Sequence, residues 1–510
     1  MIERFDIVII GSGVGGGTLA NALAGSGARI LIVERGDFIP QEDENWSPQA
    51  VWGELRYRTT ERWLDRLGSE FVPYTHYCVG GNSKFWGSVL YRLRREDFGE
   101  IQHRGGVSPA WPINYETLAP YYERAERLYH VHGRDDGSDP TEPPRGPFPY
   151  PPVEHQGRIA LVVERLRALG LHPSHLPLGV LHPGESGGCI LCSTCNSYPC
   201  KIRAKSDADV CSVSPALEHD NVTLWTNSLT ERLVTNGSGD KVIAAEIARG
   251  GQTFRVEAPL FVVSCGAANS AALLLRSKSE LHRDGLANSS GLVGRNYMSH
   301  VVTMLGAFMP PRHDTAFQKT VAINDFYLRG PDADYPLGQI QSQGRSHAAI
   351  ARAAGPPGSR QVPTWAYDAW FARGVEWLAM SEDLPSPDNR VSVTTDGRIR
   401  LQREPSNVEA HRELVAVTRR MLRKVGAWFV MAIPTGDFNT THQCGTAVFG
   451  TDPKTSVLDP WCRSHDVENL FVVDGSFFPS SAAVNPALTI AAQALRTADH
   501  IQQTHFSHLG

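Results

Sequence analysis

The sequence lacks a long apolar run, a surplus of basic residues and an internal repeat. Its apolar stretches, such as Leu260 to Ser264, have the length of a buried strand, whereas a membrane-spanning helix needs about 18 apolar residues or more. Lysines and arginines number 49 against 54 aspartates and glutamates, which gives a net charge of -5. We therefore expect no membrane span and no basic face for nucleic acid, although a mildly acidic surface would tolerate cationic substrates.

A leader segment and disulfides are not expected either. Strand-like residues begin at Phe5, directly after Met1-Ile-Glu-Arg4, so a signal peptide or twin-arginine leader has no room. The expected location is cytoplasmic, where the nine cysteines would be thiols or metal ligands rather than disulfides. A chain of 510 residues exceeds one small core, and two joined domains are the expected organisation.

The first 36 residues have the pattern of a strand, a glycine-rich turn, a helix and a second strand. Ile7 to Ile10 is an apolar run typical of a buried parallel strand. Gly11 makes the tight turn, Gly13 lets the backbone approach a pyrophosphate, and Gly16 lets the helix sit close on the sheet. Glu34 ends the second strand, where its carboxylate can accept hydrogen bonds from a ribose and would repel a 2′-phosphate. This unit predicts a bound dinucleotide other than NADP.

Three further segments carry a resemblance to a known family. They are Val79-Gly-Gly-Asn-Ser-Lys-Phe-Trp86, His442-Gln-Cys-Gly-Thr446, and Asn469 to Ser476 followed by Asn485 to Ile490. With the N-terminal unit, they closely resemble the glucose-methanol-choline (GMC) flavoprotein oxidoreductases over nearly the whole chain. The resemblance implies an α/β fold, with a Rossmann-type FAD-binding domain of the GMC and pyranose-oxidase kind and an α+β substrate-binding domain built on an antiparallel sheet. It also implies FAD rather than NAD.

The resemblance implies an FAD-binding domain that is discontinuous in sequence. Residues 1–135, 201–300 and 441–510 are assigned to it, residues 136–200 to a cysteine-rich excursion, and residues 301–440 to the substrate-binding domain. Apolar residues at helical spacing predict a packed helix between Trp111 and Tyr129. Further strands are predicted at Val222–Thr226, Lys241–Ile247 and Thr253–Glu257, before the strand that contains Leu260.

The resemblance also assigns residues to the cofactor. Gly11, Gly13, Gly16 and Glu34 would hold the ADP half; Gly80, Gly81, Asn82 and Ser83 would lie along the flavin; Asp474 and Gly475 would reach the pyrophosphate and ribityl chain. Some sugar oxidases of the family attach FAD covalently through a histidine after the paired glycines. The corresponding place here is near Phe85, which cannot form that bond, and Cys78 is expected to be an ordinary buried cysteine. Non-covalent FAD is therefore expected.

Two residues are expected to carry the chemistry. In this family, the histidine of the H-x-x-G-T motif and a His or Asn some forty residues later both face flavin N5 across the substrate, and here these positions are His442 and Asn485. Alcohol oxidation needs a base for the hydroxyl proton while a hydride leaves carbon for the flavin, and imidazole can be that base. The Asn485 amide can donate a hydrogen bond to the developing alkoxide without titrating.

Four cysteines cluster in the sequence at Cys189, Cys192, Cys195 and Cys200. Thiolates at such spacing could ligate zinc or an iron-sulfur cluster, and certain GMC dehydrogenase subunits carry a cluster in a cysteine-rich segment, although with different spacing. The preferred interpretation is a loop of structural thiols without metal. A redox disulfide is the third interpretation.

The segment Ser108 to Ile113 resembles a bacterial branch of the family related to sugar-oxidising members. The expected substrate is a small polyol or aminosugar, with aminoglycosides as a special case. Carboxylates that could pair with substrate ammonium groups, and tryptophans that could stack on sugar faces, are expected in the substrate region. They are Asp325, Asp332, Asp334, Glu376, Asp383, Trp365, Trp370 and Trp377.

Two alternative activities stay open at this point. One is a dehydrogenase that passes electrons through the cysteine segment to a redox partner. The other is a flavoprotein lyase, in which His442 does acid-base work and the flavin stays redox-silent. The sequence does not decide between oxygen and another electron acceptor, the regiochemistry or the oligomeric state.

Overall fold

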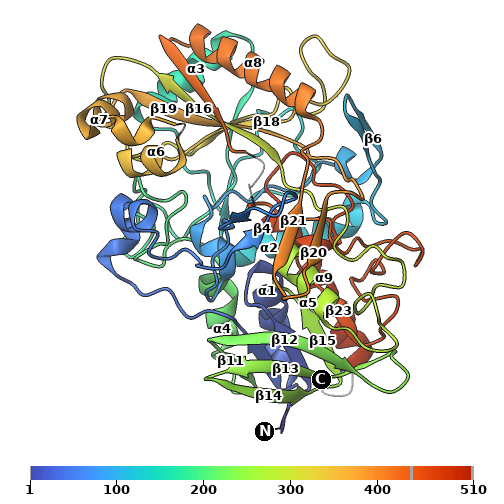
Figure 1. The fold of residues 1–510 in the computed structure, drawn as a ribbon. Coiled ribbons are helices and arrows are strands. Elements are labelled where there is room, and N and C mark those ends of the chain that lie inside the picture. Colours follow the sequence, from blue (N-terminus) through green and yellow to red (C-terminus); the bar gives the residue numbers. More distant parts are fainter. Residues whose placement is uncertain (1, 356, 437–439, 507–510) are drawn as a thin grey trace.

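Two layers of sheet, one parallel and one antiparallel, form the framework of the protein (Figure 1). The computed structural model describes residues 2–355, 357–436 and 440–506. The parallel sheet lies in the lower half of Figure 1 and the antiparallel sheet in the upper half. No helix in these ranges is long and apolar enough to cross a membrane.

The lower layer is a five-stranded parallel sheet in the order β11-β3-β2-β15-β23. Its three central strands consist wholly of buried apolar residues, as expected where helices cover both faces of a parallel sheet. The predicted strands at Ile7–Ile10 and around Leu260 are confirmed. The bounds are β2 Ile7–Ile10, β3 Ile30–Val33, β11 Val222–Trp225, β15 Leu260–Val263 and β23 Leu470–Val472.

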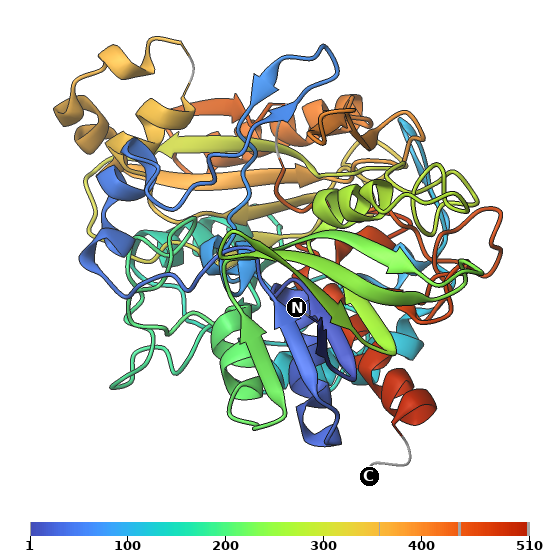
Figure 2. The ribbon, with the colours of Figure 1, turned by 60° about the horizontal axis from the view of Figure 1, so that its bottom comes forward.

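Helices and an antiparallel ribbon complete this layer. Helix α1 (Val14–Leu23) packs against α9 (Ala487–His505), so the first and last helices are neighbours, and α2 (Tyr115–Leu128) packs on α9 as well. Figure 2 shows the ribbon crossing in front of the parallel strands. Its strands are β12 Ser228–Thr235, β13 Val242–Arg249 and β14 Gln252–Glu257, with β1 Ile2–Arg4 at the edge.

The upper layer is a six-stranded antiparallel sheet in the order β22-β16-β19-β18-β17-β9. Helices α8 (Val408–Lys424) and α3 (Gly157–Ala168) cover its outer face, where Trp377 lies in a buried cluster with Leu414. Because side chains alternate along a strand, Leu378 faces the opposite, inner side. The bounds are β9 Pro173–His175, β16 Val301–Phe308, β17 Val321–Ile323, β18 Gln339–Ser342, β19 Gly374–Ser381 and β22 Phe429–Pro434.

Smaller elements join the two layers. A four-stranded sheet in the order β20-β21-β4-β5 pairs segments far apart in the sequence, and α6 and α7 stand beside the upper layer (Figure 1). The bounds are β4 Trp63–Leu64, β5 Glu70–Phe71, β6 Ile101–His103, β7 Gly106–Ser108, β8 Val131–His132, β10 Leu178–Gly179, β20 Arg390–Val393, β21 Ile399–Gln402, α4 Ser214–Ala216, α5 Ala267–Arg276, α6 Ala348–Ala354 and α7 Thr364–Phe371.

The predicted division into domains cuts across some of these contacts. Residues 136–200 supply α3 and β9 to the antiparallel layer, and β21 of the region 301–440 pairs with β4 near the N-terminus. These pairings join segments that the sequence assigned to different units. The domain boundaries therefore stay a prediction.

Candidate active site

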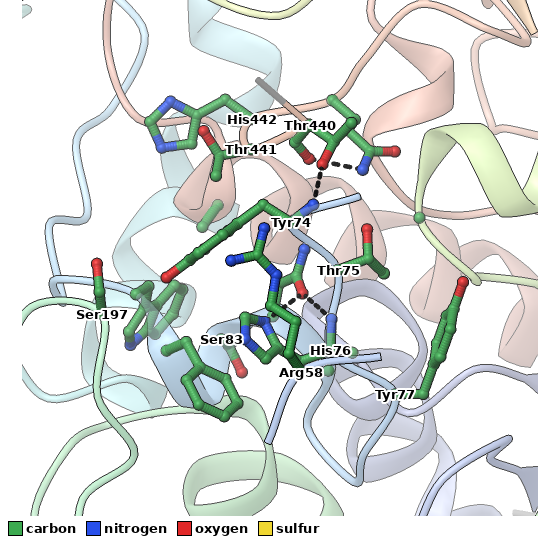
Figure 3. Close-up of a pocket in the computed structure, with 18 of the residues that line it drawn as sticks. Arg58, Tyr74, Thr75, His76, Tyr77, Ser83, Ser197, Thr440, Thr441 and His442 are labelled. Atoms are coloured by element: carbon green, nitrogen blue, oxygen red, sulfur yellow. Dashed lines mark hydrogen bonds between the residues drawn. The ribbon is translucent and has the colours of Figure 1, made fainter. Parts of the chain in front are cut away.

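A cavity of about 1320 Å³ lies between the two layers. Glu34 and the glycine-rich turn line one part, and His442 and Asn485 line another. Figure 3 shows His442 above Tyr74, whose ring extends across the pocket with its hydroxyl toward Ser197, while Arg58 lies between Tyr74 and His76. The cavity therefore joins the predicted cofactor residues to the predicted catalytic pair.

The glycine-rich turn is shaped as its sequence predicts. Gly11 has φ +105°, and a Cβ there would lie 2.2 Å from the Ser264 carbonyl oxygen. A Cβ on Gly16 would lie 2.1 Å from the Gly11 oxygen, whereas a Cβ on Gly13 would meet no atom within 4 Å. Gly13 is the N-cap of α1 and lines the cavity. The free N–H groups of the helix start thus border an open space, which suits a pyrophosphate.

Glu34 is tied to this turn through Ser12. The Glu34 Oε2 atom accepts from the Ser12 hydroxyl at 2.6 Å and the Ser12 N–H at 3.1 Å, and Oε1 accepts from the Gly36 N–H at 3.0 Å. Burial raises the pKa of the Glu34 carboxyl group. The Ser12 hydroxyl oxygen also accepts from the Gly80 N–H at 3.1 Å, so one small side chain connects the two glycine turns. Sequence reasoning missed Ser12.

The second glycine turn begins with Gly80 and Gly81 in the left-handed region, at φ +86° and +55°. The Asn82 side-chain oxygen accepts from the His76 N–H at 2.8 Å, and the Ser83 hydroxyl donates to the Gly80 oxygen at 2.6 Å. These four residues line the cavity, as do Asp474 and Gly475. The Asp474 carboxylate accepts from Gly266, Ser270 and Ser476, so it holds the turn that carries Gly475.

The cavity fits a flavin dinucleotide. It is continuous from Glu34 to His442, and the Gly13 face leaves room for a phosphate group. Two buried polar atoms on its wall, Thr75 Oγ1 and Trp86 Nε1, have no hydrogen-bond partner in the described structure. A bound ring system with polar edges would supply such partners.

His442 and Asn485 come together at the inner face of the antiparallel sheet. The Asn485 Nδ2 and His442 Nε2 atoms are 3.3 Å apart, and the His442 Nδ1 atom lies 2.8 Å from His300 Nδ1. The His300 Nε2 atom lies 3.1 Å from the carbonyl oxygen of Ser481, which can only accept. Neutral His300 must therefore carry its proton on Nε2 and accept at Nδ1. His442 then donates from Nδ1, which leaves a lone pair on its Nε2 atom.

The surroundings of His442 favour the neutral ring. Burial is the main cause that lowers its pKa well below the usual value, and electrostatic interaction with His300 and Lys319 lowers the pKa further. The backbone of His442 has φ +54°, in the left-handed region that few residues other than glycine adopt. The tight turn and the neutral state together present an unprotonated Nε2 atom beside Asn485.

A chain of amides fixes the orientation of Asn485. The amide chain consists of Asn324, Gln339, Gln341 and Asn485, and it begins at the Asp139 carboxylate. Asp139 accepts from Asn324 Nδ2 at 2.6 Å, Asn324 Oδ1 accepts from Gln339 Nε2 at 2.9 Å, and Gln339 Oε1 accepts from Gln341 Nε2 at 3.1 Å. Gln341 Nε2 also donates to Asn485 Oδ1 at 3.2 Å. A carboxylate only accepts, so each amide has one direction and the Asn485 NH₂ group points toward His442.

The cysteine segment forms part of the cavity wall. Asn196 and Ser197 line the cavity, and the buried Lys205 ammonium group anchors the segment by donating to the carbonyl oxygens of Cys195, Tyr198 and Trp86 at 2.6–2.9 Å. Each of the nine cysteines is a free thiol. In the described part of the chain, no group of three or more His, Cys, Asp or Glu is arranged to hold a metal ion.

The carboxylates and tryptophans predicted to bind substrate do not line the cavity. Sequence patterns do not indicate which neighbours each of these side chains meets in the fold. Asp325 pairs with His172, Asp334 pairs with Arg329, and Asp332 is exposed. Asp383 pairs with Arg403, Glu376 is buried beside Trp370, Trp365 is exposed, and Trp377 lies in the core under α8.

Sequence similarity to known proteins establishes the family to which the chain belongs. Two sequence profiles described as GMC oxidoreductase match the chain, the N-terminal one over residues 74–302 and the C-terminal one over residues 384–494. The 6'''-hydroxyparomomycin C oxidase of Streptomyces lividus is 33% identical, over 99% of this chain and 93% of its own length. This chain belongs to the GMC oxidoreductases.

Other GMC relatives agree with this membership. The paromamine 6'-oxidase of Streptomyces fradiae is 33% identical, over 97% of this chain and 90% of its own length. Among solved structures, pyridoxine 4-oxidase from Mesorbium loti aligns with a TM-score of 0.69 at 19% identity, over 98% of this chain and 99% of that one. The predicted fold class is confirmed. As a GMC oxidoreductase, the chain is an FAD-dependent enzyme that acts on CH–OH groups.

Proposed function

We propose that this enzyme oxidises a hydroxyl group of a sugar-like substrate, with aminosugars as first candidates, to an aldehyde or ketone. The observation that carries the proposal is the unprotonated Nε2 atom of His442 beside the Asn485 NH₂ group, at the wall of a cavity that fits FAD. The substrate class is supported by the relatives that are 33% identical, both of which bear the names of aminoglycoside oxidases.

In the proposed reaction, His442 and Asn485 both act on the substrate oxygen. The hydroxyl group takes the position between them, and its proton passes to His442 Nε2. The Asn485 Nδ2 group donates a hydrogen bond to the oxygen as negative charge develops there. Bound FAD would supply the hydride acceptor, so the substrate would lose two electrons and one proton to the cofactor and its other proton to the base. His300 keeps the His442 ring in the tautomer that this step needs.

The proposed cofactor residues are those that line the cavity. Gly11, Gly13 and Glu34 would hold the ADP half, Gly80 to Ser83 would lie along the flavin, and Asp474 with Gly475 would reach the pyrophosphate and the ribityl chain. Gly16 would act indirectly, by letting α1 approach the turn.

We further propose that FAD is bound without a covalent link. Phe85 is buried and stacks on His76, with ring centroids 3.6 Å apart. Burial raises the pKa of the Cys78 thiol well above its usual value, which disfavours the reactive thiolate. Acid precipitation of the purified enzyme should leave the yellow colour in the supernatant. Colour retained in the pellet would contradict the proposal.

Anaerobic mixing with a panel of alcohols tests the proposed function. The panel contains glucose, glucosamine, paromamine and 2-methyl-1,2-propanediol. Bleaching of the oxidised flavin by a sugar would support the proposal, and readmitting air would separate an oxidase from a dehydrogenase. A flavin that stays oxidised with every member would favour the lyase alternative, which the names of the relatives do not favour.

The rate is expected to stay high at mildly acidic pH. The reaction needs neutral His442, whose pKa is lowered by burial and by the neighbouring charges. Because protonation removes the base, kcat/KM should fall with decreasing pH only well below 6.5, the ordinary pKa of histidine. The measurement is the pH profile of kcat/KM for the best sugar of the panel. An acid limb centred at or above pH 6.5 would contradict the described environment.

Gln341 is expected to act on the rate through Asn485. In Gln341→Met the amide chain is broken, and the Asn485 amide loses the bond that orients it. We expect flavin reduction about tenfold slower, the scale of one hydrogen bond. The measurement is a double-mutant cycle with Asn485→Ala. If Gln341 acts through Asn485, the second change costs nothing further in that background, whereas two independent losses would show a merely structural role.

A further inference from the structure

Lys319 is a buried ammonium group in the cavity wall that the proposed reaction does not use. Its side chain is 5% exposed, and its Nζ atom donates to Asn196 Oδ1 at 2.9 Å and to Gln343 Oε1 at 3.0 Å. Gly87 leaves the space for this group, because a Cβ there would lie 2.2 Å from the Lys319 Nζ atom. An ammonium group has three donors, and two are occupied.

No carboxylate compensates the charge of Lys319 in the described structure. Its hydrogen-bond partners are neutral amides, and the described carboxylates that line the cavity are Glu34 and Asp474, both at the nucleotide end. Burial and the nearby charge of Lys205 lower the pKa of Lys319 to about 7. A ligand that supplies an oxygen acceptor would restore the charged form.

Gln343 provides a second unsatisfied donor at the same place. Its side chain is 3% exposed and lines the cavity, and its Nε2 group has no hydrogen-bond partner among the described residues. Since the Gln343 oxygen is occupied by Lys319, the NH₂ group is what the side chain offers to a ligand. Lys319 and Gln343 therefore present donors only.

Strand β18 and the residue after it set the position of Gln343 relative to the reacting hydroxyl, because the Gln343 N–H continues the pairing with β19 by donating to the Glu376 oxygen. Gln341 contacts Asn485, and Gln343 follows two residues later, so the two side chains lie on the same side of the chain, about 7 Å apart. That separation is near the width of a six-membered sugar ring. One end of such a ring can reach His442 and Asn485 while the other reaches Lys319.

We propose that Lys319 and Gln343 form a substrate subsite that binds hydroxyl oxygens of a sugar ring on the side away from the reacting carbon. The inference rests on the proposed oxidation of a sugar hydroxyl and deepens it. Hydroxyl oxygens accept hydrogen bonds from both groups, whereas a substrate ammonium group would meet donors and a like charge. The subsite thus selects oxygen over nitrogen at this end of the ring, and the amino groups of an aminosugar substrate lie elsewhere.

The variants Lys319→Met and Lys319→Gln test the subsite. For the best sugar of the panel, Lys319→Met should raise KM by about 10- to 100-fold, the scale of a hydrogen bond from a charged donor. Lys319→Gln keeps a donor and should recover most of the loss. Oxidation of 2-methyl-1,2-propanediol should change less than about twofold, because this diol is too short to reach the subsite. Lys201→Met, on the outer side of the cysteine segment, is the matched control.

A sugar with one ring hydroxyl replaced by an ammonium group gives a second readout. The wild type should discriminate against the analogue whose ammonium group lies opposite the reacting carbon, and Lys319→Met should lose that discrimination. An unchanged KM in Lys319→Met, or an equal loss with the diol, would overturn the subsite while leaving the proposed function intact. Bleaching of the flavin by the diol alone would contradict both the proposed sugar oxidation and the subsite. The visible spectrum of bound FAD confirms that each variant is folded.

Discussion

Replacing His442 with alanine is expected to leave FAD bound and to slow its reduction by substrate by about two to four powers of ten, the usual contribution of a general base. The variant removes the only ring whose Nε2 lone pair meets the Asn485 NH₂ group in the described cavity. His442 is not among the residues assigned to the nucleotide, so the flavin content should stay near that of the wild type. The measurement is stopped-flow flavin reduction under anaerobic conditions, at saturating sugar.

A second buried histidine serves as the control for His442. His411 on α8 bonds to the Thr303 and Ser381 hydroxyl groups on the outer face of the antiparallel sheet and does not line the cavity. His411→Ala should lower the thermal stability but leave the reduction rate close to that of the wild type. A His442→Ala enzyme reduced at the wild-type rate would remove the base from the proposal.

Replacing Gly13 with valine is expected to give a folded protein without FAD. A Cβ at Gly13 meets no protein atom within 4 Å, and its backbone has φ -68°, which any residue can adopt. The added side chain instead enters the space assigned to the pyrophosphate. The purified variant should be colourless, with a far-ultraviolet circular dichroism spectrum like that of the wild type.

Two other glycines, one in the same turn and one just after the end of α1, provide control variants for this prediction. Gly25 is exposed and a Cβ there meets nothing within 4 Å, so Gly25→Val should retain FAD. A Cβ on Gly15 would lie 1.8 Å from the Val473 carbonyl oxygen, so Gly15→Val should fail to fold. A yellow Gly13→Val protein with full flavin content would refute the assignment of the turn.

The parts of the fold that sequence could predict are those with local signals. The central parallel strands are continuous apolar runs, and the turn after Ile10 carries glycines at the spacing of a dinucleotide site. The helix predicted between Trp111 and Tyr129 is confirmed as α2, which begins after the Asn114 cap. The strands predicted at Val222–Thr226, Lys241–Ile247 and Thr253–Glu257 are confirmed as β11, β13 and β14.

The sequence did not predict the polar groups that surround the catalytic pair. Gln339 and Gln341 lie in the buried strand β18 and Gln343 follows directly after its end, and this period of two was the available signal. Their partners lie far away in sequence, however, because Asp139, Asn324 and Asn485 meet only after the layers assemble. The role of Lys319 likewise has no local sequence signal. It depends on the lack of a described carboxylate near the lysine, in a cavity that is built from distant segments.

The fit of Gly15 against Val473 has a consequence for the order of events during synthesis. Helix α1 is complete by residue 23, yet the strand end on which it rests is made more than 400 residues later. At about 5–20 residues per second, a ribosome takes tens of seconds to cover that distance. Until then the nucleotide turn lacks its packing contact with Val473, and it stays exposed to chaperones and proteases. Cofactor loading is thus a late event, which follows synthesis of the strand end at Val473.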